Sequence, residues 1–425
     1  MRLTAWRLFA IASLLSSAVA ATRPHYGGTL RVQMKARVAT LDPAELPEDL
    51  ATLVFDRLVS WSESGQPQPA LATSWRHDAD FKRWEFQLRP WVKFHDGSPV
   101  TASAIAETLK PLVAVPSGDA LVIRSDQPSP KLLQILASSS IFKRAADGSI
   151  VGTGPFRVTA WEPNRRAIFA ANEDYWAGRP YADRIEVEMG RSPRDQALDL
   201  DLNKADIVEL GFGDTRRTMQ NGKRTWTSPP VDLLAVVFEA SSDEHMRQAL
   251  ALSIDRATIH AVLLQKQGLP AESILPQWLS GYAFLFSATR DLERARELGR
   301  GAAPLTLAYN PADPTAHLIA DRIAVNAREA GLVIRPVTAG AQTAAAHIIR
   351  TRVNWPDPSR ALGSVAPPID NSPQSLYIAE SELLREHRII PLFHLPEIYG
   401  IGPRVRGWAP SRWGGWNLDS VWLVP

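Results

Sequence analysis

A strand–helix–strand pattern between residues 305 and 337 constrains the fold of this chain more than any other feature. A short apolar strand comes first, and Asp313 followed by Pro314 then marks the start of a helix. Gly331 allows a left-handed exit from that helix, and residues 332–337 read as a second strand. Two strands joined by one helical crossover lie parallel in the same sheet, so the second half of the chain is predicted to be α/β.

The first half of the chain shows a different pattern, in which short strands alternate apolar and polar residues. We expect such half-buried strands at residues 29–34, 84–88 and 185–189. Helices are predicted at residues 101–110 and, as one long helix, at 245–264. The chain has 425 residues, enough for two or three domains. Together these elements predict a mixed α/β protein with at least two lobes.

Composition excludes several kinds of site. The chain has no cysteine, which excludes disulfides, thiolate zinc sites, iron–sulfur clusters, a cysteine nucleophile and a lipid-modified N-terminal cysteine. The formal charge of +2 comes from Arg2 and Arg7, because the first twenty residues contain no Asp or Glu. The remaining chain is neutral and offers no electrostatic reason to bind nucleic acid or an anionic membrane.

The N-terminus is predicted to be a signal peptide comprising residues 1–20. Its two arginines precede an apolar run at residues 8–15, and Ala18 to Ala20 form a small-residue cleavage site. The alternative is an amphipathic first helix of the folded domain. Because the run is too short to span a bilayer and no cysteine is present to carry lipid, we expect a soluble periplasmic protein.

No catalytic motif stands out in the chain. A nucleophile elbow, the HExxH zinc motif, a Walker-type loop and a dinucleotide-binding glycine motif are all absent, and the nine histidines are dispersed. The aromatic content is more informative, because four of the fourteen tryptophans fall in the last eighteen residues: Trp408, Trp413, Trp416 and Trp422. Tryptophan rings suit stacking on a ligand, although they serve equally as core residues.

A series of motifs extends over nearly the whole mature chain: GGTLRV at 27–32, LVFDRLV at 53–59, PALATSW at 69–75, WEFQLRPWVKFHDGSPVTA at 84–102, GTGPFRV at 152–158, NEDYWAGRP at 172–180, ADIV at 205–208, RQALALSIDR at 247–256, DLERAREL at 291–298 and NWPDP at 354–358. These motifs and their order along the chain resemble those of the extracellular solute-binding proteins of ABC importers, in the oligopeptide, dipeptide and nickel class called family five.

The resemblance implies a two-lobed, periplasmic-binding-protein-like clamshell (type II, cluster C-like) with an extra small domain. The implied divisions are lobe I from residues 21–50, 151–240 and 397–425, a shortened small domain II at 51–150, and lobe III at 241–396. It also implies that the lobes close on a ligand and that the loaded protein docks on a membrane permease.

One departure from the family pattern concerns ligand binding. Peptide-binding members carry an acidic residue between the tryptophan and the final Asp-Pro, where it pairs with the ligand's α-amino group. Here Trp355 is followed directly by Pro356, Asp357 and Pro358. The amine anchor is therefore missing unless Asp357 replaces it, because a buried ammonium without a carboxylate partner is costly.

Seven residues are predicted to contact the ligand. Position within the matched segment selects Asn354, Trp355 and Asp357, and the loop after the first strand offers Lys35 and Arg37, which could equally be solvated. The glycine-flanked pair Trp413 and Trp416 completes the set. We expect Asp96 and Gly97 to form a structural turn, and Asp255 to pack and cap rather than touch ligand.

The sequence thus predicts a monomeric periplasmic protein that captures a peptide-like or other small organic solute for an ABC importer, without cofactor, metal or nucleic acid and without catalysis. A second reading keeps the fold but makes the protein a ligand sensor or scavenger with no dedicated importer. A third reading is a secreted hydrolase on the same scaffold, for which the sequence offers no nucleophile–base pair.

Overall fold

The structure is a computed structural model that describes residues 23–340, 344–363 and 372–424. The predicted signal peptide, residues 1–20, lies outside the described residues. Within them, the largest element is an eleven-stranded sheet, in which β15 (Leu269–Pro270) pairs with β19 at its side. The other strands follow the order β10 (Phe156–Glu162), β11 (Arg166–Ala171), β12 (Arg184–Glu188), β1 (Thr29–Gln33), β13 (Ile207–Glu209), β19 (Ile389–Ile401), β14 (Arg224–Phe238), β18 (Ala346–Arg352), β16 (Leu305–Tyr309) and β17 (Ile334–Thr338).

The predicted strand–helix–strand unit is confirmed. Strands β16 and β17 pair in parallel, and α10 (Pro314–Glu329) connects them. The Asp313 carboxylate accepts hydrogen bonds from the backbone N–H groups of Thr315 and Ala316, and so caps the helix. Gly331 has a φ of +78°, the left-handed conformation that its position after the helix requires.

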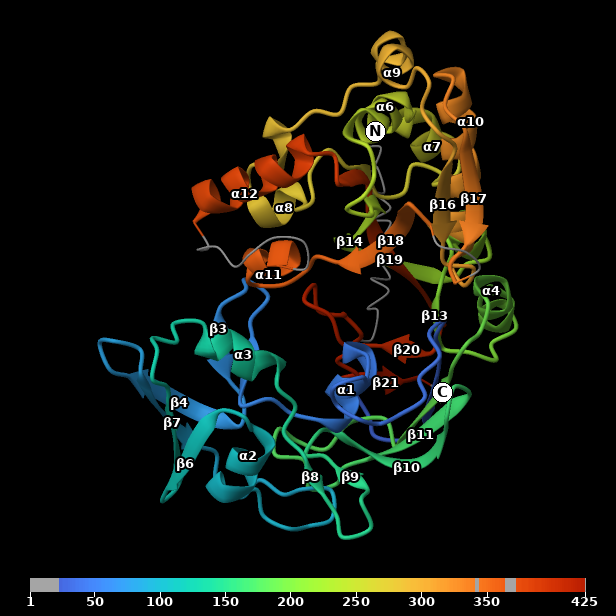
Figure 1. Cartoon of the computed structure of the whole chain (residues 1–425). Helices are drawn as coiled ribbons and strands as arrows, with labels where there is room; N and C mark the ends of the chain where they lie inside the picture. Colours follow the sequence, from blue (N-terminus) through green and yellow to red (C-terminus); the bar gives the residue numbers. More distant parts are fainter. Residues whose placement is uncertain (1–22, 341–343, 364–371, 425) are drawn as a thin grey trace, which may run out of the picture.

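The two ends of the large sheet belong to different lobes, and two long antiparallel strands join them. β14 and β19 have 15 and 13 residues, and one end of this pair lies beside β13 while the other lies beside β18. Figure 1 shows β10 and β11 in the lower half, and β16, β17 and α10 in the upper half.

Pro229 and Pro230 lie within β14 and not in a loop. The register between β14 and β19 shifts on both sides of Pro230. Proline has no N–H to donate to the sheet, so the pairing is interrupted there without the strand ending. Such irregularities bend a strand, and these lie where the strands pass between the lobes.

A smaller unit is built on a separate four-stranded sheet. Its order is β4 (Ala72–His77), β5 (Arg83–Leu88), β7 (Ala120–Arg124) and β6 (Val113–Ser117), with α2 (Ala102–Thr108) and α3 (Leu132–Ser138) nearby. Thr101 caps α2 through its side chain. The structural turn is confirmed, because the Asp96 carboxylate accepts hydrogen bonds from the backbone and hydroxyl of Ser98 while Gly97 has a φ of +84°.

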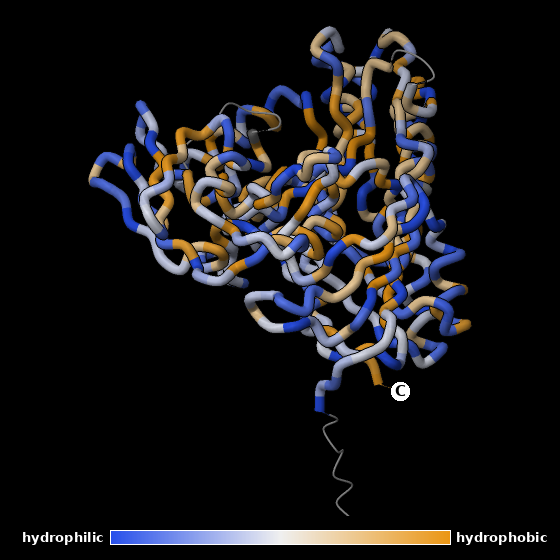
Figure 2. Tube along the Cα trace, turned by 90° about the horizontal axis from the view of Figure 1, so that it is seen from below, coloured by the Kyte–Doolittle hydropathy of each residue, from blue (hydrophilic) through white to orange (hydrophobic). Residues whose placement is uncertain are grey.

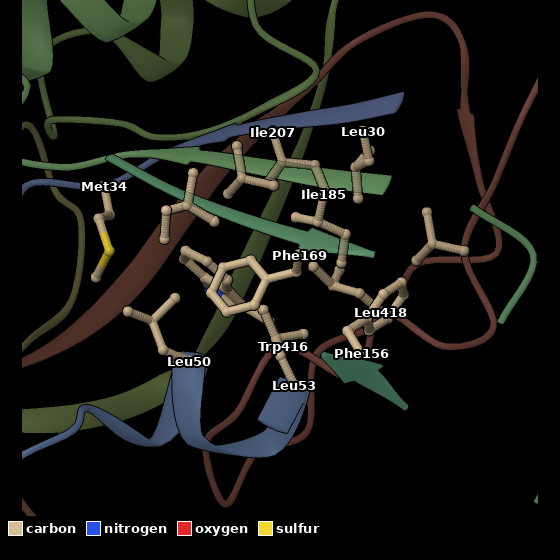
Figure 3. Close-up of a cluster of buried hydrophobic side chains, with 14 of the residues drawn as sticks. Leu30, Met34, Leu50, Leu53, Phe156, Phe169, Ile185, Ile207, Trp416 and Leu418 are labelled. Atoms are coloured by element: carbon tan, nitrogen blue, oxygen red, sulfur yellow. The ribbon is translucent and has the colours of Figure 1, made fainter. Parts of the chain in front are cut away.

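Each unit has its own hydrophobic core, as expected of separately packed lobes. In Figure 3, Phe169 and Ile185 of the large sheet face Leu50 and Leu53 of α1 (Glu48–Val54), with Trp416 beside them. Figure 2 shows apolar segments running through the interior and polar segments along the outer loops. The expected residue boundaries of the three domains remain a prediction.

The single helix predicted over 245–264 is wrong. The structure has two helices there, α6 (Glu244–Ser253) and α7 (Arg256–Val262), separated by Ile254, which has extended backbone, and Asp255. Asp255 causes the break, because its carboxylate accepts hydrogen bonds from the backbone N–H and the hydroxyl of Thr258 at 2.9 and 2.8 Å. The expected capping role of Asp255 is therefore confirmed.

The other predicted strands are confirmed as β1, β5 and β12, each within one or two residues of the expected ends. The remaining elements complete the chain: β2 (Val59–Trp61), β3 (Pro67–Pro69), β8 (Lys143–Arg144), β9 (Ile150–Val151), α4 (Pro193–Asp201), α5 (Thr215–Gln220), α8 (Gln277–Ser280), the 3₁₀ helix η1 (Ala283–Leu285), α9 (Leu292–Leu298), α11 (Pro358–Gly363), α12 (Pro373–Arg385), β20 (Val405–Arg406) and β21 (Trp422–Leu423).

Candidate functional site

A cleft of about 710 Å³ lies where the small unit and both halves of the large sheet meet. In Figure 1, α11 faces α3 and α1 across this region. The lining side chains come from segments far apart in the sequence: Pro47, Glu48, Asp49, Trp61, Lys131, Gln134, Ile135, Ala137, Ser138, Ser139, Arg352, Asn354, Trp355, Pro356, Asp357, Arg360 and Trp413. This is the size and the placement between packed units that are typical of a small-molecule site.

Polar contacts made by two side chains, Lys131 and Arg360, bridge the small unit and the upper half across this cleft. The Lys131 ammonium, at the start of α3, donates to the Ser359 hydroxyl at 2.8 Å and lies 3.3 Å from the Asp357 carboxylate. The Arg360 guanidinium of α11 donates to the Ser138 hydroxyl at 2.8 Å. Both contacts join α3 to α11, so both depend on the two units being held together.

The Asp357 carboxylate is occupied within the protein. One of its oxygens accepts hydrogen bonds from the backbone N–H and the hydroxyl of Ser359, at 3.0 and 2.6 Å, at the start of α11. Its other oxygen forms the ion pair with Lys131. Asp357 lines the cleft, and its predicted contact with a ligand stays a prediction. Its hydrogen bonds with Ser359 stabilise the start of α11, and its ion pair with Lys131 links the small unit to the upper half.

Tryptophan rings form two walls of the cleft. The Arg360 guanidinium carbon lies 3.7 Å from the Trp355 ring centroid, a cation–π contact. The Trp413 indole N–H donates to the Ser62 carbonyl at 2.8 Å, and its ring packs closely against Gly65, whose φ is +76°. These anchored rings are flat apolar surfaces held at fixed positions.

Ionic and polar groups form the floor of the cleft. Arg352 binds both carboxylate oxygens of Glu397, at 2.7 and 3.1 Å, and donates to the Asn354 side chain at 3.1 Å. Burial acts to lower the pKa of Arg352, but the Glu397 and Asp49 carboxylates outweigh it and raise the pKa above its usual value. Arg352 therefore remains charged and ion-paired with Glu397.

Two acidic residues begin α1 at the edge of this floor. Glu48 is bound by the Arg57 guanidinium at 3.0 Å. Asp49 is half-buried, and burial together with the nearby Glu397 carboxylate raises its pKa well above that of an ordinary aspartate. Asp49 shows no functional signal in the sequence, because two acids in a first helical turn are typical of an ordinary helix start. Arg352 and Arg360 belong to no ligand-binding pattern in the sequence either.

The structure brings together four of the seven predicted ligand residues, Asn354, Trp355, Asp357 and Trp413. Lys35 lies elsewhere, in a second cleft of about 780 Å³ at the carboxyl ends of β1, β12, β13 and β16. Its backbone N–H donates to the Glu209 carboxylate at 2.6 Å. Arg37 packs against Gly190 rather than against the first cleft.

Trp416 is a core residue in this structure. Its side chain is 1% exposed, and its indole N–H donates to the Tyr399 hydroxyl at 3.3 Å. The turn at Gly414 and Gly415, both with positive φ, lets Trp413 face the cleft while Trp416 enters the core of the lower half (Figure 3). Trp416 is thus not available to a ligand in the cleft.

Within residues 23–340, 344–363 and 372–424, no helix has the length and apolar character needed to cross a bilayer. Among the same residues, no group of three or more histidine or acidic side chains is arranged to hold a metal ion.

Comparison with known families identifies the class of protein. Residues 66–343 match the family model described as bacterial extracellular solute-binding proteins, family 5 Middle. This match covers more than half of the chain, so the protein belongs to the family 5 extracellular solute-binding proteins. The implied fold, a two-lobed mixed α/β binding protein, is confirmed with it.

Individual relatives are distant but cover much of the chain. The probable D,D-dipeptide-binding periplasmic protein of Escherichia coli is 23% identical over 379 residues, which are 77% of this chain and 72% of that protein. The nickel-binding periplasmic protein of E. coli is 25% identical over 248 residues, but this match covers only 49% of this chain and 47% of that protein.

Solved structures agree on the fold. The dipeptide-binding protein of Pseudoalteromonas sp. SM9913 in complex with Met-Leu superposes with a TM-score of 0.82 at 16% identity, covering 93% of this chain and all of that one. The Staphylococcus aureus nickel-binding protein in complex with Ni(L-His)2 gives a TM-score of 0.81 at 16% identity with the same coverage.

Proposed function

We propose that this protein is an exported, monomeric binding protein that captures a small peptide-like or other organic solute and delivers it to the permease of an ABC importer. The observation that carries the proposal is the cleft of about 710 Å³, whose walls come from α1, α3 and the segment between β18 and α11. A ligand placed there touches all three units at once, so its binding favours the arrangement in which they are together.

The relatives' names support the same class of cargo. They include proteins named for binding D,D-dipeptides, murein peptides, oligopeptides and nickel, most of them described as periplasmic. The cleft has indole rings held at fixed positions and several charged groups. Among the described residues, no cluster of metal ligands is found. Those features favour an organic solute with polar ends over a bare metal ion.

The test is native mass spectrometry of the mature protein purified from the periplasm without denaturation. We expect a discrete added mass that is lost on collisional activation, and a Trp355→Ala variant that retains much less of it. Trp91→Ala is the matched control, because Trp91 is 93% exposed and outside the cleft. Uptake of the identified solute by cells, lost on deletion of the gene, then establishes the transport role.

Three outcomes would contradict the proposed function or change it. If a solute is bound but its uptake is unchanged by the deletion, the protein is a sensor or scavenger rather than an importer component. If the wild-type protein carries no added mass and its tryptophan fluorescence stays unchanged with peptides, amino acids, sugars and metal chelates, solute capture itself is refuted. Conversion of the bound solute into product would indicate an enzyme.

A further inference from the structure

Two arginines on the lower half of the molecule share one backbone oxygen. The Arg224 guanidinium, at the start of β14, donates a hydrogen bond to the Val405 carbonyl, and the Arg406 guanidinium donates to the same oxygen at 2.8 Å. Because one oxygen accepts from both, the two guanidiniums lie within a few ångströms of each other. Figure 1 shows β20, which contains Arg406, in the lower half near the C-terminus. The fold therefore holds two positive charges side by side.

No acidic side chain of the described residues compensates this pair. Neither arginine forms an ion pair with them, and the second hydrogen bond of Arg406 goes to another neutral acceptor, the Pro403 carbonyl, at 2.6 Å. Burial and the positive charge of Arg406 together lower the pKa of Arg224 from its usual value. Two like charges at such short range repel each other, so this arrangement is unfavourable unless an anion neutralises it.

Further cations lie next to the pair. Lys223 precedes Arg224, and Arg404 lies two residues before Arg406; both donate to neutral oxygens and form no ion pair within the described part of the chain. Asp206, at the start of the neighbouring β13, is 3% exposed, and its carboxylate is already bound by another arginine at 2.9 and 3.0 Å. The chain after residue 20 is neutral overall, so this surface is a local excess of positive charge.

The arrangement of donors suits a phosphate group better than a carboxylate. A guanidinium presents five N–H donors in one plane, and a single arginine already satisfies both oxygens of a carboxylate. Two adjacent guanidiniums offer more donors and a second positive charge. A phosphate group matches them, because its oxygens point in different directions and a phosphate monoester carries a charge of about −1.5 to −2 at neutral pH.

We propose that Arg224 and Arg406 form a binding site for a phosphate group, carried either by free phosphate or by a lipid headgroup. Arg224 is exposed and Arg406 is partly exposed, so solvent reaches both. Neither arginine lines the two clefts described above, so the site is separate from the proposed solute site. Lipid phosphate would hold the protein at a membrane surface, whereas free phosphate would stabilise the lower half alone.

The first arm of the test measures free phosphate. Thermal unfolding and isothermal titration calorimetry follow the wild-type protein with increasing inorganic phosphate, while sodium chloride keeps the ionic strength constant. We expect the melting temperature to rise with phosphate and not with chloride alone, because an anion that binds only the folded protein stabilises it. Arg224→Gln and Arg406→Gln are each expected to weaken phosphate binding by about tenfold or more, since each removes a charge-assisted interaction.

The variants separate this role from a structural one. In buffer without phosphate, neither Arg224→Gln nor Arg406→Gln should lower the melting temperature, because each substitution relieves the repulsion between two like charges. A role confined to folding predicts the opposite result, a lower melting temperature with the phosphate response retained. Arg76→Gln is the matched control, because Arg76 is an exposed arginine of the small unit that is paired with Glu85. Its response to phosphate should equal that of the wild-type protein.

The second arm measures co-sedimentation with vesicles of pure phosphatidylcholine and of phosphatidylcholine mixed with phosphatidic acid. Binding to the mixed vesicles that both arginine variants lose identifies a lipid phosphate, and a response to inorganic phosphate alone identifies the free anion. The proposal is overturned if the wild-type protein responds to neither probe, or if both variants respond as the wild-type protein does. Solute retention in the cleft should be equal in all of these proteins, so a failure here leaves the proposed function standing.

Discussion

Glu380 tests how strongly burial controls the ionisation of a carboxyl group in this protein. It lies in α12 with 0% exposure, and its carboxylate accepts hydrogen bonds from the Tyr282 hydroxyl at 2.9 Å and from the backbone N–H groups of Leu275, at 3.1 Å, and Ile274. Burial raises its pKa to about 7, from the usual 4.5, in spite of these donors. The perturbation is Glu380→Gln, which keeps an acceptor oxygen but cannot titrate.

The sign and size of the effect follow from the two pKa values. Between pH 4.5 and pH 7 the unfolded chain releases the Glu380 proton while the folded chain keeps it. Glu380 therefore lowers the free energy of unfolding as the pH rises through this window, by roughly 3 kcal/mol in total when one pKa unit corresponds to about 1.4 kcal/mol. Below pH 4.5 both states are protonated and the contribution of Glu380 is fully retained.

The assay is urea unfolding of three proteins at several pH values from 4.5 to 8, namely wild type, Glu380→Gln and the control Glu382→Gln. Glu382 lies in the same helix but is exposed. We expect the stability of Glu380→Gln, relative to wild type, to increase by roughly 3 kcal/mol from the lowest to the highest pH, and that of the control to remain parallel to wild type. Parallel curves for Glu380→Gln and wild type would show that the buried carboxyl is already ionised in the folded protein.

Three further predictions test the cleft and the core. Lys131→Met removes the ion pair with Asp357 and a hydrogen bond between units, so solute binding measured by calorimetry should weaken about three- to tenfold, and Lys131→Arg should restore most of it. Gly152→Ala places a Cβ only 2.0 Å from the Val54 carbonyl oxygen, so urea unfolding should show a loss of about 3 kcal/mol or more. Trp416→Ala empties a fully buried site in the lower core and should cost about 3–5 kcal/mol in the same assay. An unchanged affinity for the first variant, or unchanged stability for the other two, contradicts the corresponding contact.

Local sequence signals predicted local structure well where the competing conformations were few. The Asp313 cap and the Gly331 exit correctly bounded α10, because capping and positive φ depend on a few neighbouring residues. The prediction of a single helix over residues 245–264 was wrong because a local side-chain interaction decides the structure there as well. The apolar periodic pattern continues past Asp255, but the Asp255 side chain accepts hydrogen bonds from Thr258 and starts a second helix.

The candidate site was predicted only in part. Trp355 is predicted from its place in a matched motif and Trp413 from its flanking glycines, and both line the cleft. Trp416 has the same chemical character and is only three residues from Trp413, yet it enters the core. Nothing in residue type separates these two rings. The difference arises from the backbone turn at Gly414 and Gly415 and from the elements that pack on each side.

The sequence by itself determined the family, the mixed α/β character and the absence of thiol chemistry, because these depend on motif order, short-range periodicity and composition. Only the tertiary structure decided which acidic side chains form ion pairs. Asp49 and Asp357 are both ordinary acidic residues in the sequence, and their surroundings differ because Lys131, distant in the sequence, reaches the carboxylate of Asp357 and not that of Asp49. Charge neutralisation acts over a few ångströms in space, so it depends on how the lobes are packed together and not on position along the chain.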